Sequence, residues 1–150
     1  MDKWGPDIWK YIHTYTVLVN DQEFRKHKKE ILHHLVTVAT NLPCPICTEH
    51  AKTYLTNNKL RVVTDKQSLL KLFFEFHNNV NTHKKKQLQT IDILHSYTNN
   101  NIRQCAIKYL DTWLKSSSSR YLGYSNSFTR KLYMKQFKEF YFKYNFVFKH

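Results

Sequence analysis

Apolar residues recur at intervals of three and four along much of the chain, and this spacing is typical of helices that bury one face. The first stripe follows Pro6, a residue favoured in a first helical turn, and consists of Ile8, Ile12, Tyr15 and Val19. A second stripe follows the capping box of Asn20 and Glu23 and stops near Pro43; it consists of Phe24, Ile31, Leu35, Val38 and Leu42. The pattern predicts one helix for each stripe.

Two more helices are predicted in the middle of the chain. Pro45 suits the first turn of a third helix, which is expected to end in the polar stretch 56–60. Thr64 and Gln67 form another capping box, and the apolar positions that follow predict a fourth helix through Val80. A polar stretch, NTHKKKQ, then interrupts the pattern.

The remainder of the chain has a more varied pattern. A short apolar segment holds Ile91 and Leu94, and the spacing then predicts a helix over 102–113. Four serines at 116–119 are typical of a flexible linker. The segment 120–150 alternates aromatic residues with lysines and predicts a terminal amphipathic helix. Such a helix suits packing against the other helices, contact with a membrane surface, or nucleic-acid binding.

The composition favours helices and a single domain. The 150 residues include only two glycines and three prolines, too few for the turns of several tight hairpins. A chain of this length can bury one core. No run of about 18 apolar residues and no signal-peptide pattern is present, so we expect a soluble protein of a cytosol-like compartment. The formal net charge of +13 favours contact with polyanions or anionic membranes.

Cys44 and Cys47 form a CxxC pair that suits zinc binding, redox exchange or neither. Two thiolates at this spacing supply half of a tetrahedral zinc site and His50 offers a third ligand, but no second CxxC or HxxxH pair supplies the rest. For redox exchange, the spacing allows a disulfide across one helical turn, and the helix start predicted at Pro45 stabilises a thiolate. Two ordinary neighbouring cysteines are the third interpretation.

The remaining cysteine is Cys105. Because three cysteines cannot all pair within one chain, at least one is free or bonds to another chain. Cys105 lies on the apolar stripe of the helix predicted over 102–113, so we expect a buried, inert thiol, with a bond to a partner as the alternative.

Three stretches, in this order, resemble the signatures of the Erv/ALR family of FAD-linked sulfhydryl oxidases, and most of all its compact viral branch. They are GPDIWKYIH at 5–13, LPCPICTEH at 42–50 and HNNVNTHKKK at 77–86. The resemblance implies an all-α fold, a four-helix bundle with a fifth helix packed across it, which holds FAD and is usually dimeric. Further helical segments follow it in this chain.

The resemblance and the composition together predict the organisation of the chain. The oxidase domain is expected at 1–97, an additional helix packed on it at 98–115, a serine-rich linker at 116–119 and a basic aromatic segment at 120–150.

The resemblance also implies roles for individual residues. Cys47 takes the position beside the flavin ring, and Cys44 takes the outer position that meets the substrate thiolate. Aromatic rings suit an adenine, amides suit hydrogen bonds to a ribose, and lysines suit a pyrophosphate. The residues implied in FAD binding are Gly5, Trp9, His13, Cys47, His77, Asn78, Val80, Asn81, Lys84 and Lys86.

The implied activity is the FAD-dependent oxidation of protein dithiols, with O2 as the acceptor and hydrogen peroxide as the product. Many family members carry a shuttle cysteine pair that this chain lacks, so we expect electrons to come directly from a dithiol substrate or a thioredoxin-like donor. The expected homodimer would serve viral proteins assembled in the host cytoplasm, with the virion as a second location. The alternative function is a zinc-stapled helical adaptor whose basic tail binds nucleic acid or a membrane.

Overall fold

The fold is built from helices. A computed structural model describes residues 4–117 and 127–148, which contain no β-strand, and the predicted all-α class is confirmed. The elements are α1 Gly5–Leu18, α2 Asp21–Lys26, α3 Lys28–Ala39, α4 Pro45–Tyr54, α5 Asn57–Arg61, α6 Lys66–His83, the 3-10 helix η1 Ile91–Tyr97, α7 Ile102–Ser117, α8 Ser127–Tyr144 and the 3-10 helix η2 Asn145–Phe148. In the described part of the chain, no helix combines the length and the apolar character needed to span a bilayer.

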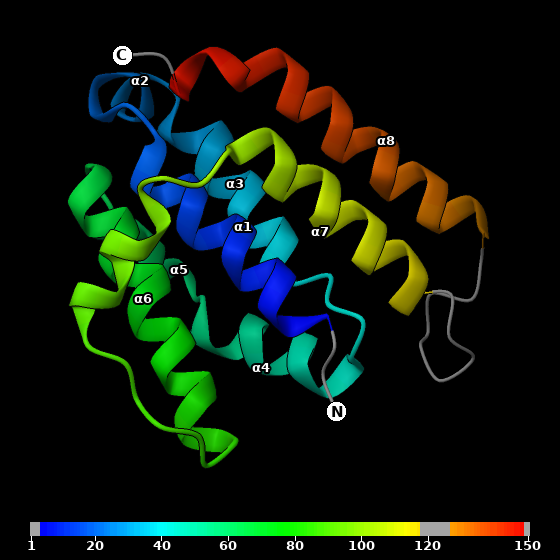
Figure 1. Ribbon diagram of the computed structural model, residues 1–150, viewed down its shortest axis with the longest axis horizontal. Coiled ribbons are helices and arrows are strands. Elements are labelled where there is room, and N and C mark those ends of the chain that lie inside the picture. The colour runs from blue at the N-terminus through cyan, green and yellow to red at the C-terminus, as the bar shows by residue number, and fades with distance from the viewer. Residues whose placement is uncertain (1–3, 118–126, 149–150) are drawn as a thin grey trace.

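The central helix of the bundle is α1. It lies between α6 and α7 and contacts both of them, and η1 packs on it as well (Figure 1). The outermost helix, α8, runs along α7 (Figure 1). The four predicted bundle helices correspond to α1, to α2 with α3, to α4, and to α6. Positions 118–119 of the predicted linker lie outside the described residues, and the two preceding serines belong to α7.

The second predicted helix is wrong as a single element, because it divides at His27 into α2 and α3. His27 leaves the helical conformation, with φ −118° and ψ 27°. Its ring packs edge-on against Tyr144 and Phe146, with both ring centroids 5.4 Å away. Contacts with the far end of the chain therefore override the helical preference of this segment.

The capping interactions are partly as predicted. Asn20 Oδ1 accepts the Glu23 N–H at 3.0 Å, as expected, but the Asn20 N–H donates to the Val147 carbonyl at 2.7 Å. The fourth predicted helix begins one residue later than expected. Its N-cap is Asp65, whose carboxylate accepts the Ser68 N–H at 2.8 Å, so the predicted cap at Thr64 is wrong. A carboxylate is a stronger acceptor at a helix start than a hydroxyl is.

The carboxyl-terminal helix completes the core. Phe137 of α8 is 4% exposed, and its ring lies 5.3 Å from Tyr11 and 5.1 Å from Tyr109. Phe140 of the same helix stacks on His34 of α3 at 4.0 Å. The helix α8 thus joins α1, α3 and α7 through aromatic contacts.

Replacement of Phe137 by alanine is expected to lower the free energy of unfolding by about 3–5 kcal/mol, because it leaves a cavity among these rings. The matched control is Phe142→Ala on the same helix. Phe142 is 65% exposed, so its loss should change stability by no more than about 0.5 kcal/mol. Urea denaturation followed by circular dichroism measures both values. Equal stability of Phe137→Ala and the unmodified protein would show that α8 is not part of the folded unit.

Candidate active site

The CxxC pair lies at the start of α4. Cys44 is the N-cap residue, Pro45 occupies the first turn, and Cys44 and Cys47 form a disulfide with their Cα atoms 5.2 Å apart. The Cys44 sulfur accepts the Cys47 N–H at 3.2 Å. Thr48 anchors the preceding loop, because its hydroxyl accepts the Leu42 N–H at 3.1 Å. Once the disulfide opens, the positive end of the α4 dipole favours a thiolate at this position.

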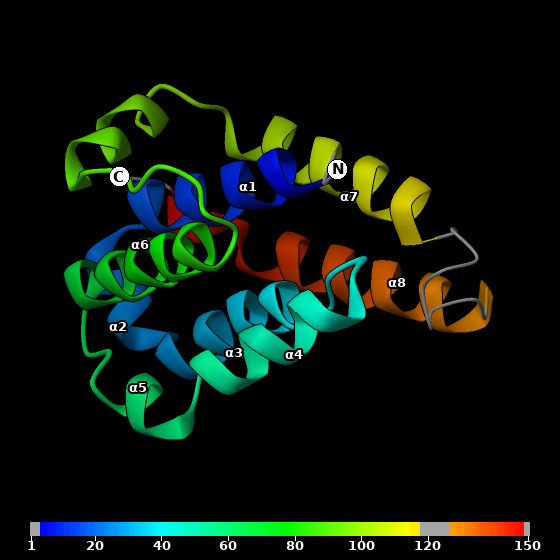
Figure 2. The same ribbon diagram turned by 90° about the horizontal axis from the view of Figure 1, so that it is seen from below.

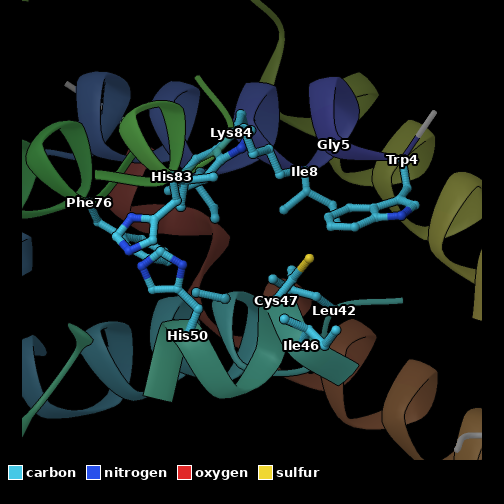
Figure 3. Close-up of a pocket in the computed structure, with 14 residues that line it drawn as sticks. Trp4, Gly5, Ile8, Leu42, Ile46, Cys47, His50, Phe76, His83 and Lys84 are labelled. Atoms are coloured by element: carbon cyan, nitrogen blue, oxygen red, sulfur yellow. The ribbon is translucent and has the colours of Figure 1, made fainter. Parts of the chain in front are cut away.

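A cavity of about 260 Å³ lies beside the disulfide, between α1 and α4, with α6 at one side (Figure 3). The sulfur of Cys47 points into it, whereas Cys44 is not among the lining residues. The lining is mostly apolar or aromatic and consists of Trp4, Gly5, Ile8, Trp9, Ile12, Ala39, Leu42, Ile46, Cys47, His50, Phe76, Val80, His83 and Lys84. This volume is near the lower end for ligand pockets, so it suits one ring system of a larger ligand.

Five of the predicted cofactor-binding residues meet at this cavity: Gly5, Trp9, Cys47, Val80 and Lys84. Gly5 is buried and carries no Cβ, so its backbone leaves room that a side chain would occupy. The Lys84 side chain adds a positive charge to an otherwise largely uncharged lining.

Trp9 connects the cavity to a partly buried aromatic cluster. Its ring stacks on His77 with the centroids 3.9 Å apart and an angle of 7° between the planes. His13 Nε2 is hydrogen-bonded to His77 Nδ1 at 2.8 Å, with one ring as donor and the other as acceptor. The other ring nitrogen of His13, Nδ1, is buried and has no hydrogen-bond partner among the described residues.

Both histidines of this cluster are neutral near pH 7. Burial, and after it the neighbouring His77, lowers the pKa of His13 to about 3. Burial is also the main cause that lowers the pKa of His77 to about 4, followed by the positive charges of Lys86 and Lys84. The cluster therefore presents flat, uncharged rings with cations nearby.

His13 and His77 do not themselves line the cavity, and neither do the last three predicted residues, Asn78, Asn81 and Lys86. The Asn78 amide holds the loop after α6, because it donates to the Gln89 carbonyl at 2.8 Å and accepts the Gln89 N–H at 3.0 Å. Asn81 is buried, and its carbonyl accepts the Lys86 N–H at 2.8 Å. These residues thus fix the loop that carries the lysines.

Several lining residues were not predicted as site residues. Trp4 is the N-cap of α1, and Ile8 and Ile12 follow at intervals of one turn; a stripe of this kind cannot be distinguished in sequence from ordinary core packing. His50 and His83 close one end of the cavity, with their rings 4.3 Å apart (Figure 3). His50 Nε2 is hydrogen-bonded to Asn79 Oδ1 at 2.7 Å, a pairing between α4 and α6 that no local signal reveals.

The described residues provide no set of ligands for the zinc site that the CxxC pair suggested. Within residues 4–117 and 127–148, no three His, Cys, Asp or Glu side chains gather closely enough to hold a metal ion. Both thiols of the CxxC pair are joined to each other. Cys105 is free and buried between α1 and α7, and its sulfur lies 3.8 Å from the Thr14 hydroxyl.

Comparisons with known proteins agree on one family. The model of the Erv1 / Alr family matches residues 6–104. The FAD-linked sulfhydryl oxidase of African swine fever virus, isolate Pig/Kenya/KEN-50/1950, is 34% identical over 85 residues, which are 57% of this chain and 71% of that protein. A protein of Invertebrate iridescent virus 6 is 30% identical over 96 residues, 57% of this chain and 82% of its own length. No solved structure matches the chain.

Proposed function

Because the chain belongs to the Erv1 / Alr family, we propose that it is an FAD-dependent sulfhydryl oxidase, which forms disulfides in protein thiols with O2 as the final acceptor. One observation carries the proposal. The sulfur of Cys47, half of a CxxC disulfide, faces a mostly apolar cavity that Trp9 joins to His77. The same chemistry was expected from the motifs, and no metal cluster in the described part of the chain supports the zinc adaptor.

The residues around the cavity fit FAD. Trp9 and His77 offer aromatic surface, and the unpartnered Nδ1 of His13 offers a buried polar atom for a ligand. Gly5 permits a close approach of the ligand to α1. Lys84 lines the cavity and, with Lys86 on the loop beyond it, would neutralise the phosphates. The side-chain amide of Asn78 and the backbone carbonyl of Asn81, both on α6, hold this loop in place.

The first step is an exchange between the substrate and the CxxC disulfide. A substrate thiolate attacks the sulfur of Cys44, and the Cys44–Cys47 bond breaks as a mixed disulfide forms. Cys47 leaves as a thiolate that faces the cavity, where the start of α4 stabilises its charge. The second thiol of the substrate then attacks the substrate sulfur that is bonded to Cys44. The substrate leaves as a disulfide, and Cys44 is released as a thiol.

The second half of the cycle restores the disulfide. FAD, when bound, accepts the two electrons of the dithiol and transfers them to O2, which yields hydrogen peroxide. The protein contributes placement, because Cys47 alone of the pair lines the cavity. The walls of the cavity around this sulfur are largely apolar.

We further propose a homodimer that works in the host cytoplasm at viral assembly sites or in the virion. The named relatives are viral proteins, and disulfides formed in a reducing compartment need a dedicated oxidase. Ile107 on α7 is 58% exposed and is a candidate dimer contact. On α8, Phe128 and Phe142 are exposed among lysines, which supports contact with an anionic surface such as a membrane or nucleic acid.

The colour of the purified protein tests the proposal. We expect a yellow preparation whose flavin absorption band is bleached by dithiothreitol without oxygen and returns when air is admitted. The same preparation should consume O2 and release hydrogen peroxide in the presence of dithiothreitol. A colourless protein that contains about one zinc ion per chain would contradict the oxidase and favour the adaptor.

A further inference from the structure

A second concavity, separate from the cavity at Cys47, lies between α5 and the pair α2 and α3 (Figure 2). We call it the basic groove, and its volume is about 740 Å³. It is lined by Arg25, Lys26, Lys28, Lys29, Glu30, Leu32, His33, Val36, Asn57, Leu60 and Arg61. These residues include five lysines and arginines and one glutamate. The ratio of basic to acidic residues is therefore higher in the groove than in the whole chain, which has 24 basic and 11 acidic residues.

Three of the five cations form no ion pair with another described residue. Arg25 and Lys26 pair with acidic residues of α2, at 3.0 Å and 3.8 Å. Lys28, Lys29 and Arg61 make no ion pair within the described ranges. Like charges gathered in one groove repel one another, so the groove favours an anionic ligand.

The floor of the groove indicates the kind of anion. Leu32, Val36 and Leu60 are the apolar residues of its lining. None of the lining residues, which all belong to the described part of the chain, is Phe, Tyr or Trp. Proteins that bind single-stranded nucleic acid combine a positively charged groove with rings on which bases stack. A groove without these rings suits a protein segment with acidic and apolar residues better.

The cysteines of the chain explain why such a segment is needed. Of the three cysteines in these 150 residues, Cys44 and Cys47 form the disulfide and Cys105 is buried. None is left to relay electrons from a substrate, so another protein must bring its own dithiol to Cys44. A second copy of this chain, with 24 basic and 11 acidic residues, matches the groove less well than an acidic segment does.

We propose that the basic groove docks an acidic segment of the protein that delivers its dithiol to Cys44. This inference rests on the proposed oxidase function. The groove begins just beyond the end of α4, a helix of ten residues that starts at the cysteine pair and spans about 15 Å. A docked chain can bridge that distance, and attraction between opposite charges raises the rate of encounter. The partner's two thiols become a disulfide while Cys44 and Cys47 become thiols, so that electrons and protons balance.

Two synthetic peptides test the proposal. They share one CxxC sequence, and their tails contain leucine with glutamate in one peptide and leucine with glutamine in the other. For the unmodified protein we expect kcat/KM for oxidation of the glutamate peptide to exceed that of the glutamine peptide by about tenfold at low salt. The ratio should fall towards one as the salt concentration rises.

Charge reversal assigns the effect to the groove. In the triple variant Lys28→Glu, Lys29→Glu, Arg61→Glu we expect the ratio of the two kcat/KM values to drop to about one or below. The matched control places the same change of charge on the exposed side of α8, as Lys131→Glu, Lys135→Glu, Lys138→Glu, and should keep the preference. Each ratio compares two substrates of one preparation, so a partial loss of folded enzyme does not affect it. A second variant, Lys28→Gln, Lys29→Gln, Arg61→Gln, is milder because it removes the three charges without reversing them.

Three outcomes would overturn the proposal: a ratio near one in the unmodified protein, a ratio preserved in the groove variants, or an equal loss of preference in the α8 variant. Oxidation of dithiothreitol by the unmodified protein, measured in parallel, separates this inference from the proposed function. Absence of that oxidation would reject the oxidase itself, whereas its presence beside a ratio near one would reject only the docking groove.

Discussion

Replacement of Cys47 by serine is expected to lower the turnover of a dithiol substrate by roughly three orders of magnitude or more. Losses of this size are typical when an enzyme loses its covalent nucleophile. A serine oxygen cannot form the disulfide with Cys44, so the exchange with the substrate has no acceptor. The cavity wall changes little in size, and the protein should remain yellow. Oxygen consumption measures the turnover, and the absorption of the purified protein measures the bound flavin.

Cys105→Ser is the matched control for this experiment. Cys105 is buried beside Thr14 and does not line the cavity, so the variant should keep its flavin and its turnover. Unchanged oxidase activity in Cys47→Ser would refute the proposed path of electrons. A large loss in Cys105→Ser instead would assign a redox role to the third cysteine.

Replacement of His77 by alanine is expected to weaken the binding of FAD by about tenfold, near the upper end of what one aromatic contact contributes. His77 stacks on Trp9 and is hydrogen-bonded to His13. Its loss removes one ring and leaves the rings of Trp9 and His13 without the contact that positions them. Titration of the flavin-free protein with FAD, followed by flavin fluorescence, measures the dissociation constant. His95→Ala serves as the control, since His95 is exposed on η1 and does not line the cavity. A dissociation constant equal to that of the unmodified protein would remove His77 from the site.

Features governed by neighbouring residues could be predicted from the sequence. The cap of α2 at Asn20 and the start of α4 at Pro45 depend on a few adjacent positions. The CxxC pair was recognised for the same reason, because the bond between Cys44 and Cys47 closes within one turn of helix. The family motifs then connected this pair with residues of α1 and α6.

Features that depend on contacts between segments far apart in the sequence could not be predicted in this way. The break at His27 depends on Tyr144 and Phe146, which lie more than a hundred positions later in the chain. The end of the cavity depends on His50 of α4 meeting His83 of α6. The shift of a helix start from Thr64 to Asp65 has both kinds of cause. Asp65 is a strong local cap, and the next N–H, that of Lys66, donates to Asp21 of α2 at 2.9 Å.

The hydrogen bond from Asn20 to Val147 has a consequence for how the protein is made. The ribosome synthesises Asn20 more than a hundred residues before Val147, yet the N–H of the first donates to the carbonyl of the second. Phe137, which packs against Tyr11 and Tyr109, is also synthesised after both of them. The amino-terminal helices therefore reach their final packing only after residues 137–147 have been synthesised, and until then their unfinished core stays open to chaperones.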